Sequence, residues 1–202
     1  MIDFEPFQKI ARLNRQMVVT EKLDGTNASI YIGEDGAMQF GSRTRWITLD
    51  DDNFGFARWG MENRDELLGL GTGHHFGEYW GSGIQRGYGL AEKRFSLFNA
   101  TRWAAHDQPL DSSESQDPLA LTKWQERPPK CCGVVPVLYR GLFRTDQIDE
   151  CIQLLRKDGS YAAPGFARPE GIIVWHEAAR QLFKVTLYKD ELPKSISDRS
   201  AE

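Results

Sequence analysis

The sequence lacks an excess of positive charge. It contains 25 lysine and arginine residues against 29 aspartate and glutamate residues, which gives a formal net charge of -4 at pH 7. Proteins that recognise nucleic acid through a broad electrostatic surface are usually basic. The composition therefore excludes that mode of binding, and any nucleic acid must be recognised at local sites.

Cysteine is scarce, and long apolar runs are missing. Three cysteines, two of them adjacent (Cys131 and Cys132), make neither a disulfide framework nor a chelating motif. They are expected to be structural thiols in a reducing compartment. No run approaches the roughly 18 apolar residues of a membrane span, and residues 1–10 have no apolar signal-peptide core. We therefore predict a cytoplasmic protein without membrane contact.

The apolar content is nevertheless that of a folded domain, with 40% hydrophobic and 11% aromatic residues among 202. A chain of this length buries roughly 70% of the surface of its unfolded state, which is enough for one sizeable core. We predict one domain over residues 1–190 and a polar tail over residues 191–202. Residues 105–130, with four prolines and a polar run, are expected to form a surface excursion with one helical turn near residues 119–124.

Hydropathy patterns predict an α+β fold of mostly antiparallel sheets with helices on their outer faces. Strands are expected at residues 17–20, 28–32, 38–40, 74–80, 94–103, 171–175 and 181–187, with a hairpin turn at residues 33–36. One helix is expected over residues 50–70, opened by acidic residues and closed by glycines. A second is expected over residues 145–157, with Thr145 as its cap and Ile148, Ile152 and Leu155 on one face.

One lysine, Lys22, lies between two predicted strands in the segment Glu21-Lys22-Leu23-Asp24-Gly25-Thr26-Asn27. Asp-Gly is a common turn dipeptide, so a plain surface turn is one interpretation. The other is a nucleophile for phosphorus chemistry. A lysine attacks only as a neutral amine, and its ordinary pKa is about 10.4, so it needs burial or neighbouring cations.

The Lys-x-Asp-Gly pattern resembles the nucleophile motif of the covalent nucleotidyltransferases, which include DNA ligases, RNA ligases and mRNA capping enzymes. Further motifs follow in the order of that family: Gly41-Ser42-Arg43, Phe76-Gly77-Glu78-Tyr79, Phe95-Ser96-Leu97-Phe98, Glu170-Gly171-Ile172-Ile173-Val174 and Leu182-Phe183-Lys184-Val185. The resemblance covers residues 9–190. The extension to Thr26 and Asn27 is most similar to the RNA ligase 2-like enzymes of phages and bacteria.

This resemblance implies the fold of a ligase adenylylation domain, an ATP-grasp-like nucleotidyltransferase, and the activity of an ATP-dependent RNA ligase. Lys22 would attack the α-phosphate of ATP to form lysyl-AMP. The AMP would pass to an RNA 5'-phosphate, and a 3'-hydroxyl would then seal the strand. The implied cofactors are ATP and Mg²⁺ or Mn²⁺, and the implied partners are RNA ends, nicked or single-stranded.

The resemblance also implies roles around the nucleotide. Arg43 would hold a ribose or a phosphate, with Arg45 as an alternative. Glu78 would bond the ribose hydroxyls, Phe95 would stack on adenine, and Asn27 would belong to the nucleotide-binding set.

Further roles fall on the other motifs. Glu170 would bind a divalent metal or orient Lys22. Lys184 would contact the α-phosphate and favour the neutral amine, but Thr186 stands where related RNA ligases carry a second lysine. The adenine edge would be read by the Glu21 side chain or by the backbone from Thr20 to Lys22.

Two features near the third motif are interpreted from the residues alone. His74 and His75 are adjacent, so on a strand they point to opposite faces, and a structural role is expected. The glycine-rich residues 81–89 lack the Gly-Lys-Ser/Thr ending of a P-loop. We predict a mobile loop that flanks the nucleotide or the RNA end.

Three alternatives stay open: a DNA ligase, an mRNA-capping guanylyltransferase and a non-catalytic module that binds RNA ends. The 21 residues before Lys22 are too few for the nicotinamide-binding domain of NAD⁺-dependent ligases, which favours ATP. The 18 residues after Lys184 cannot hold an OB-fold. We therefore expect no such C-terminal domain and weak, salt-sensitive RNA binding unless a partner protein or domain adds a second surface.

Overall fold

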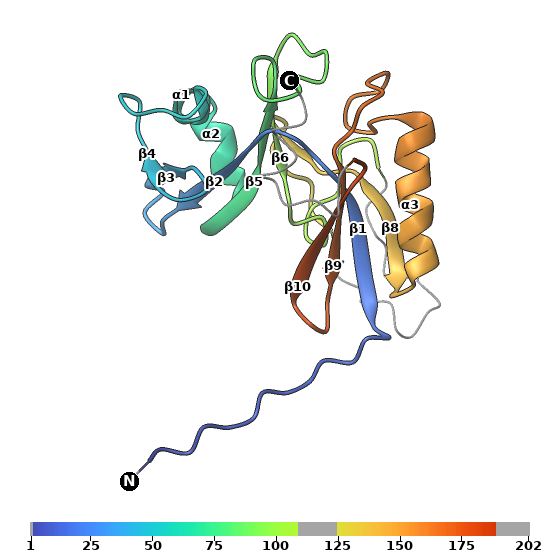
Figure 1. Cartoon of the computed structure of the whole chain (residues 1–202). Coiled ribbons are helices and arrows are strands. Elements are labelled where there is room, and N and C mark those ends of the chain that lie inside the picture. The colour runs from blue at the N-terminus through green and yellow to red at the C-terminus, as the bar shows by residue number, and fades with distance from the viewer. Residues whose placement is uncertain (1, 109–124, 189–202) are drawn as a thin grey trace.

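The computed structural model describes residues 2–108 and 125–188. Two β-sheets diverge from the short connection between β1 (Gln16–Lys22) and β2 (Thr26–Ile32), as Figure 1 shows. Each sheet has a hydrophobic core of its own. The chain thus changes sheets immediately after Lys22.

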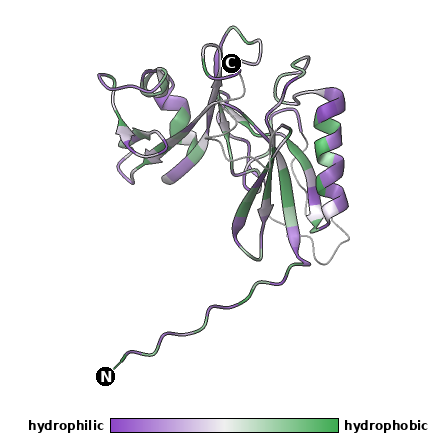
Figure 2. Ribbon diagram, in the orientation of Figure 1, coloured by the Kyte–Doolittle hydropathy of each residue, from purple (hydrophilic) through white to green (hydrophobic). Residues whose placement is uncertain are grey.

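The four-stranded sheet has the order β10 (Gln181–Thr186), β9 (Gly171–His176), β1 and β8 (Val137–Leu142), and every pair in it is antiparallel. Side chains alternate between the two faces of a strand. Met17 and Val19 lie on the face that packs against Ile152 and Leu155 of α3 (Thr145–Asp158). Lys22 and Thr20 therefore lie on the opposite face. Figure 2 shows that α3 carries both hydrophobic and hydrophilic residues, as a helix on the outside of a sheet should.

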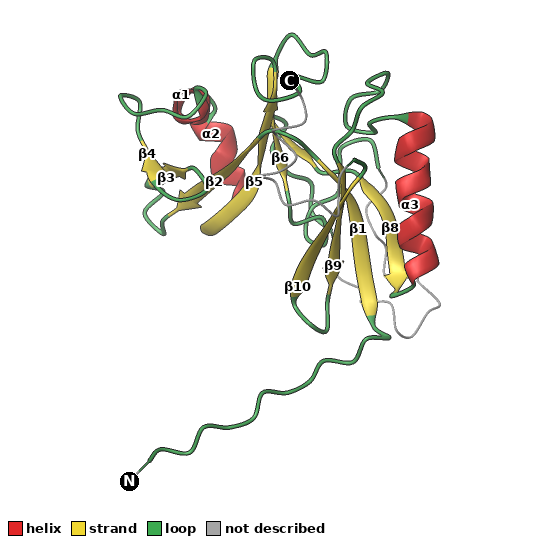
Figure 3. Ribbon diagram, in the orientation of Figure 1, coloured by secondary structure: helices red, strands yellow, loops and turns green. Residues whose placement is uncertain are grey.

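The six-stranded sheet has the order β4 (Trp46–Ile47), β3 (Met38–Gly41), β2, β5 (Gly73–Gly81), β6 (Lys93–Leu97) and β7 (Cys132–Val134). Only the β6–β7 pair is parallel among the described strands. Ile30, Tyr79 and Phe95 pack on the face covered by α1 (Phe56–Glu62), α2 (Arg64–Leu67) and the 3-10 turn Leu68–Leu70. The helices thus lie on the outer sides of the two sheets (Figure 3), which confirms the predicted α+β class.

The helix predicted over residues 50–70 begins later than expected. Phe54 and Gly55 both have positive φ, at 55° and 84°, so the helix cannot start before Phe56. An acidic residue still stabilises the start of the helix, because the Asp52 carboxylate accepts the N–H groups of Ala57 and Arg58 at 2.8 and 3.1 Å. The helical segment is then broken at Asn63 and ends in the 3-10 turn.

Other boundaries also differ from the predictions. Thr145 is the first residue of α3 and not its cap; the cap position is Arg144, which makes no side-chain capping bond. The strand predicted to run to residue 103 ends at Leu97, where the N–H of Ala100 turns back to the carbonyl of Phe98. β4, β7 and β8 were not predicted. The helical turn expected at residues 119–124 and the tail at residues 191–202 lie outside the described residues.

In the described part of the chain, no helix has the length and apolar character needed to cross a membrane.

Candidate active site

Lys22 ends β1 and forms an ion pair with Glu170, with 2.5 Å between Nζ and Oε2. The strand register explains the contact, because Lys22 is paired with Gly171, the first residue of β9, and Glu170 directly precedes it. Both side chains are largely but not fully covered, with 23% and 18% of their surfaces exposed. The pair is therefore desolvated enough to be strong and open enough to be reached by a ligand.

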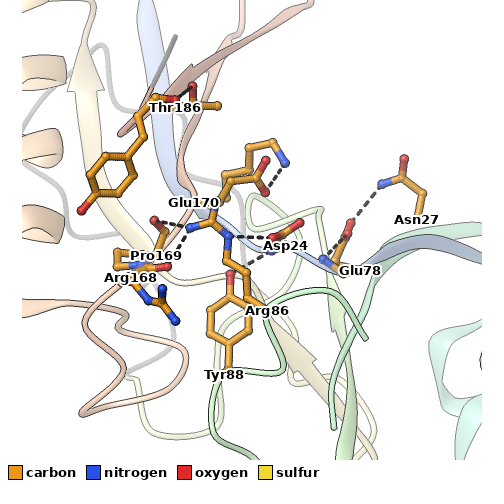
Figure 4. A network of polar contacts seen from close by, with 12 residues as sticks. Asp24, Asn27, Glu78, Arg86, Tyr88, Arg168, Pro169, Glu170 and Thr186 are labelled. Atoms are coloured by element: carbon orange, nitrogen blue, oxygen red, sulfur yellow. Dashed lines mark hydrogen bonds and ion pairs between the residues drawn. The ribbon is translucent and has the colours of Figure 1, made fainter. Parts of the chain in front are cut away.

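Glu78 of β5 faces the same region from the six-stranded sheet. Its carboxylate accepts the N–H of Gly25 and the side-chain amide of Asn27, both at 3.0 Å (Figure 4). Burial raises the pKa of Glu78 to about 7, and the positive charge of Lys22 opposes that rise. The structure thus brings together the lysine and the two glutamates that the motifs singled out.

Close packing explains why the last position of the Lys-x-Asp-Gly pattern, Gly25, is a glycine. A Cβ atom on Gly25 would lie 2.4 Å from the carbonyl oxygen of Tyr79 and 2.7 Å from Cβ of Trp80. Any larger residue would push the connection between β1 and β2 away from β5. The N–H of Gly25 would then lose Glu78, so glycine is required to hold Lys22 and Glu78 at this spacing.

Arg86 and Tyr88 tie the loop after β5 to the segments that carry Lys22 and Glu170. Nε of Arg86 donates to Oδ2 of Asp24 at 2.6 Å, and its Nη1 donates to the carbonyls of Arg168 and Pro169 at 2.9 and 3.2 Å (Figure 4). The hydroxyl of Tyr88 accepts the N–H of Asp24 at 2.8 Å. Neither residue was predicted from the sequence, where the only available signal was an arginine and a tyrosine within a glycine-rich run.

The prediction that residues 81–89 form a mobile loop is not supported. Ile84 and Tyr88 are fully buried or nearly so, and the Tyr88 ring packs edge-on against Trp80. Positive φ at several glycines allows the loop to fold back tightly on β5. The loop is a packed wall of the site.

Glu21 does not face the site, so the prediction that its side chain reads an adenine edge is wrong. It neighbours Lys22 on β1 and therefore points to the α3 side. Glu21 is 1% exposed, and its carboxylate accepts the Ser160 hydroxyl at 2.6 Å and the N–H groups of Tyr161 and Ala162 at 2.8 and 3.0 Å. The other possibility, a backbone contact between Thr20 and Lys22, stays a prediction.

Phe95 is also misassigned. Ser96 is paired with Glu78 across β5 and β6, so Phe95 lies on the opposite face. Its ring is fully buried against Phe56 and Trp59, with centroids 5.1 and 5.6 Å apart, and has no free face for a base. An exposed aromatic residue next to β6 on the Glu78 side is Phe98, which is 42% exposed and donates its N–H to the carbonyl of Phe76.

Lys184 and Thr20 lie on the Lys22 face of the four-stranded sheet. Both are in register with Ile173 of β9, two residues from the row of Lys22, Gly171 and Thr186. Thr20 is buried, whereas Lys184 is exposed and has no ion pair within residues 2–108 and 125–188. The hydroxyl of Thr186 donates to the carbonyl of Tyr188 at 3.2 Å. Lys184 thus adds a second cation to the face that carries Lys22.

Arg43 lies in the turn between β3 and β4 and is exposed, without an ion pair to any described residue. Arg45, the alternative anion holder, already forms two bonds to the Asp51 carboxylate at 2.5 and 3.0 Å. Arg43 is therefore the better candidate of the two. It lies at the edge of the sheet that carries Glu78.

The described residues include no group of three or more acidic, histidine or cysteine side chains that could hold a metal ion. Glu170 stays the candidate carboxylate ligand that the motifs indicate. This fits Mg²⁺, which commonly takes one or two protein carboxylates and completes its shell with water and substrate phosphates.

The buried Glu78 carboxyl predicts a specific dependence of stability on pH. Between pH 4.5 and about 7 the folded protein binds a proton on Glu78 that the unfolded chain does not bind. The free energy of unfolding therefore falls as the pH rises through that interval. Glu78→Gln removes this titration. When the pH is lowered from 8 to 5, the free energy of unfolding of wild type, measured in urea, should rise by about 1–3 kcal/mol more than that of the variant. The exposed Glu34→Gln serves as the control, and an equal response of Glu78→Gln and wild type would contradict the assignment.

Arg86 predicts a second effect on stability. Arg86→Ala leaves the Asp24 carboxylate and two carbonyls without their donor, so the free energy of unfolding should fall by about 1–3 kcal/mol. Arg144→Ala is the matched control, because its ion pair with Asp146 is exposed and joins near neighbours in sequence. Urea unfolding of both variants gives the comparison. Equal small losses would mean that Arg86 does not brace the site.

Solved structures of an RNA ligase share the fold described above. A variant of the Naegleria gruberi RNA ligase with ATP and Mn superposes with a TM-score of 0.53 at 18% identity, over 86% of this chain and 49% of that one. The same ligase with PPi gives 0.52 at 18% identity, over 86% and 50%. This chain therefore spans about half the length of these structures. A comparison with curated protein sequences gives no significant match.

The family profile of RNA ligases matches residues 15–186, a range that includes every strand of both sheets, from Gln16 to Thr186. Lys22, Glu78, Glu170 and Lys184 all fall within it. The chain belongs to the RNA ligase family.

Proposed function

We propose that this chain carries the adenylyltransferase site of an ATP-dependent RNA ligase, with Lys22 as the residue that accepts AMP. The observation that supports this most is the Lys22–Glu170 ion pair, placed where the faces bearing Glu78 and Lys184 meet. Membership in the RNA ligase family favours RNA over DNA as the strand that is sealed.

The ion pair defines the starting state of Lys22. At 2.5 Å the contact with the Glu170 carboxylate fixes the direction of Nζ. Attack on phosphorus needs the neutral amine, so this contact must be given up when ATP binds. A divalent cation at Glu170 would compete with Lys22 for the same oxygens. When bound, Mg²⁺ or Mn²⁺ supplies charge neutralisation to phosphate oxygens.

The proposed transfer exchanges one bond for another at the α-phosphorus. A bond forms from Nζ of Lys22 to phosphorus, the bond from phosphorus to the pyrophosphate oxygen breaks, and Nζ releases two of its three ammonium protons to solvent. The AMP then passes to an RNA 5'-phosphate, which frees Lys22, and a 3'-hydroxyl displaces AMP to seal the strand. Lys184, exposed on the face of Lys22, would neutralise charge on the α-phosphate.

The other nucleotide contacts follow from the two faces. Glu78 would accept ribose hydroxyls in place of, or beside, its bonds to Gly25 and Asn27. Phe98 replaces Phe95 as the aromatic residue proposed to stack on adenine, because Phe98 is exposed and follows β6, the strand whose Ser96 is paired with Glu78. Arg43 would contact a phosphate or a ribose.

We also propose that part of the RNA-binding surface is supplied from outside residues 15–186. The net charge of the chain is -4, and affinity for RNA depends strongly on the number of phosphates that cations neutralise. A partner protein or another domain could add that surface.

Incubation with ATP and Mg²⁺, followed by intact-mass spectrometry, tests the proposal. Wild type should gain the mass of one AMP, and Lys22→Ala should gain none, because no other lysine is held against Glu170 in the described residues. Lys130→Ala, which removes an exposed lysine far along the chain, should behave as wild type.

Three outcomes would overturn parts of this proposal. An adduct on Lys22→Ala would place the nucleophile elsewhere. An adduct from GTP alone would indicate a guanylyltransferase. The absence of an adduct with ATP, GTP and NAD⁺, on a protein that still binds RNA, would favour a non-catalytic module.

A further inference from the structure

A row of aromatic rings, three of them exposed and one half-buried, lies on the face of the six-stranded sheet opposite the described helices. The His74 ring is stacked on Phe76, with centroids 5.7 Å apart and an interplanar angle of 8°. It is also stacked on Trp46 at 6.0 Å and 26°, and it contacts Tyr31 at 4.7 Å. These four residues, Tyr31, Trp46, His74 and Phe76, are called the aromatic row below.

The strand register places the aromatic row beside the candidate active site. Asn27 pairs with Glu78, Ser29 with Phe76 and Tyr31 with His74, so all of these side chains share one face. Phe76 precedes Glu78 by two residues on β5, a distance of about 7 Å along the strand. From there the row leads through His74 to Trp46 on the edge strand β4.

These rings are not part of a core. Phe76 is 57% exposed and Trp46 is 49% exposed, whereas the aromatic residues that pack against α1, such as Phe95, lie on the opposite face. A contiguous group of large exposed rings on a folded domain marks a binding surface more often than chance. Because the rings already contact one another, their side chains need little further ordering when a ligand binds.

The neighbouring residues favour a nucleic acid strand as the occupant. The other strand residues on this face include Ser29, Gln39 and Asn27, which are uncharged, and Glu78 is the only acidic one in the described strands. Arg43 extends from the turn next to Trp46 and has no ion pair in the described residues. Aromatic rings on an open sheet face, with a cation at the edge, are the arrangement that binds single-stranded RNA by stacking.

We propose that the aromatic row stacks the bases of a single-stranded RNA segment immediately behind the strand end that receives AMP from Lys22. This proposal rests on the proposed function for the identity of the strand, and it adds where the strand lies. It also explains how an acidic chain can engage RNA, since stacking on rings does not depend on net positive charge.

The test measures the Kd of the full chain for a short fluorescent single-stranded RNA by anisotropy. Phe76→Ala and Trp46→Ala should each raise the Kd about tenfold, since the loss of one base–aromatic stack commonly has an effect of that size or more. Phe76→Tyr should restore binding and Phe76→Leu should not, which separates stacking from general apolar contact. Phe54→Ala is the control, because Phe54 is 44% exposed and its carbonyl accepts Lys93 on the α1 side.

A second probe removes the bases instead of the rings. An RNA of the same length with abasic positions should bind wild type more weakly, and Phe76→Ala should then have no further effect. Thermal unfolding of each variant checks that the fold is retained, and Phe76→Tyr serves as the folded reference.

The rate of AMP adduct formation separates this inference from the proposed function. The aromatic-row variants should form the adduct at the wild-type rate. If Phe76→Ala slows adduct formation and leaves the RNA Kd unchanged, the rings belong to the adenosine pocket and the inference is wrong. An unchanged Kd for both alanine variants would also overturn it. If wild type forms no adduct, the proposed function fails, while the Kd comparison still decides whether the rings bind RNA.

Discussion

The contact between Lys22 and Glu170 fixes the orientation of the lysine on which the rest of the site depends. Lys22 is the last residue of β1, and the chain enters the other sheet only four residues later. Its partner directly precedes β9, so the ion pair joins the start of one strand to the end of its neighbour. Arg86 reinforces the same junction from a third segment, since it bonds Asp24 on one side and the carbonyls before Glu170 on the other. The lysine is thereby oriented before any substrate arrives.

The second glutamate of the site, Glu78, is held in a buried position that raises its pKa. Glu78 is buried and lies within the field of Lys22, and its pKa of about 7 reflects a desolvation cost that the Gly25 and Asn27 bonds only partly offset. Such a carboxyl is stabilised by new donors, and ribose hydroxyls are donors of the right kind. Strained or costly groups of this sort concentrate at functional sites, which agrees with the role proposed for Glu78.

Motifs in the sequence predicted which segments meet, and the structure corrected which side chains face the site. Lys22, Glu78 and Glu170 come together as expected, although Glu78 and Glu170 lie 92 positions apart in the sequence. Glu21 and Phe95 were wrong for one reason: each is a strand neighbour of a residue that does face the site, and a shift of one residue reverses the face. The burial patterns of β1 and β6 do not reveal this phase, because both faces of these strands are largely covered. Arg86 and Tyr88 were missed because their partners are distant in the sequence. The late start of α1 depends on positive φ at Phe54, a residue type that gives no hint of that conformation.

The face of each sheet that lies opposite its helices contributes different side chains to the site. The four-stranded sheet brings the cations Lys22 and Lys184, whereas the six-stranded sheet brings Glu78, Phe98 and the aromatic row. A crystal structure of the chain after incubation with ATP and Mg²⁺ would show whether these faces act together. We predict continuous density from Nζ of Lys22 to the AMP phosphorus, with Nζ withdrawn from Glu170, the ribose at Glu78 and the base against Phe98. A nucleotide attached to a different lysine, or bound with its phosphate remote from Lys22 while the Glu170 pair stays intact, would contradict this mechanism.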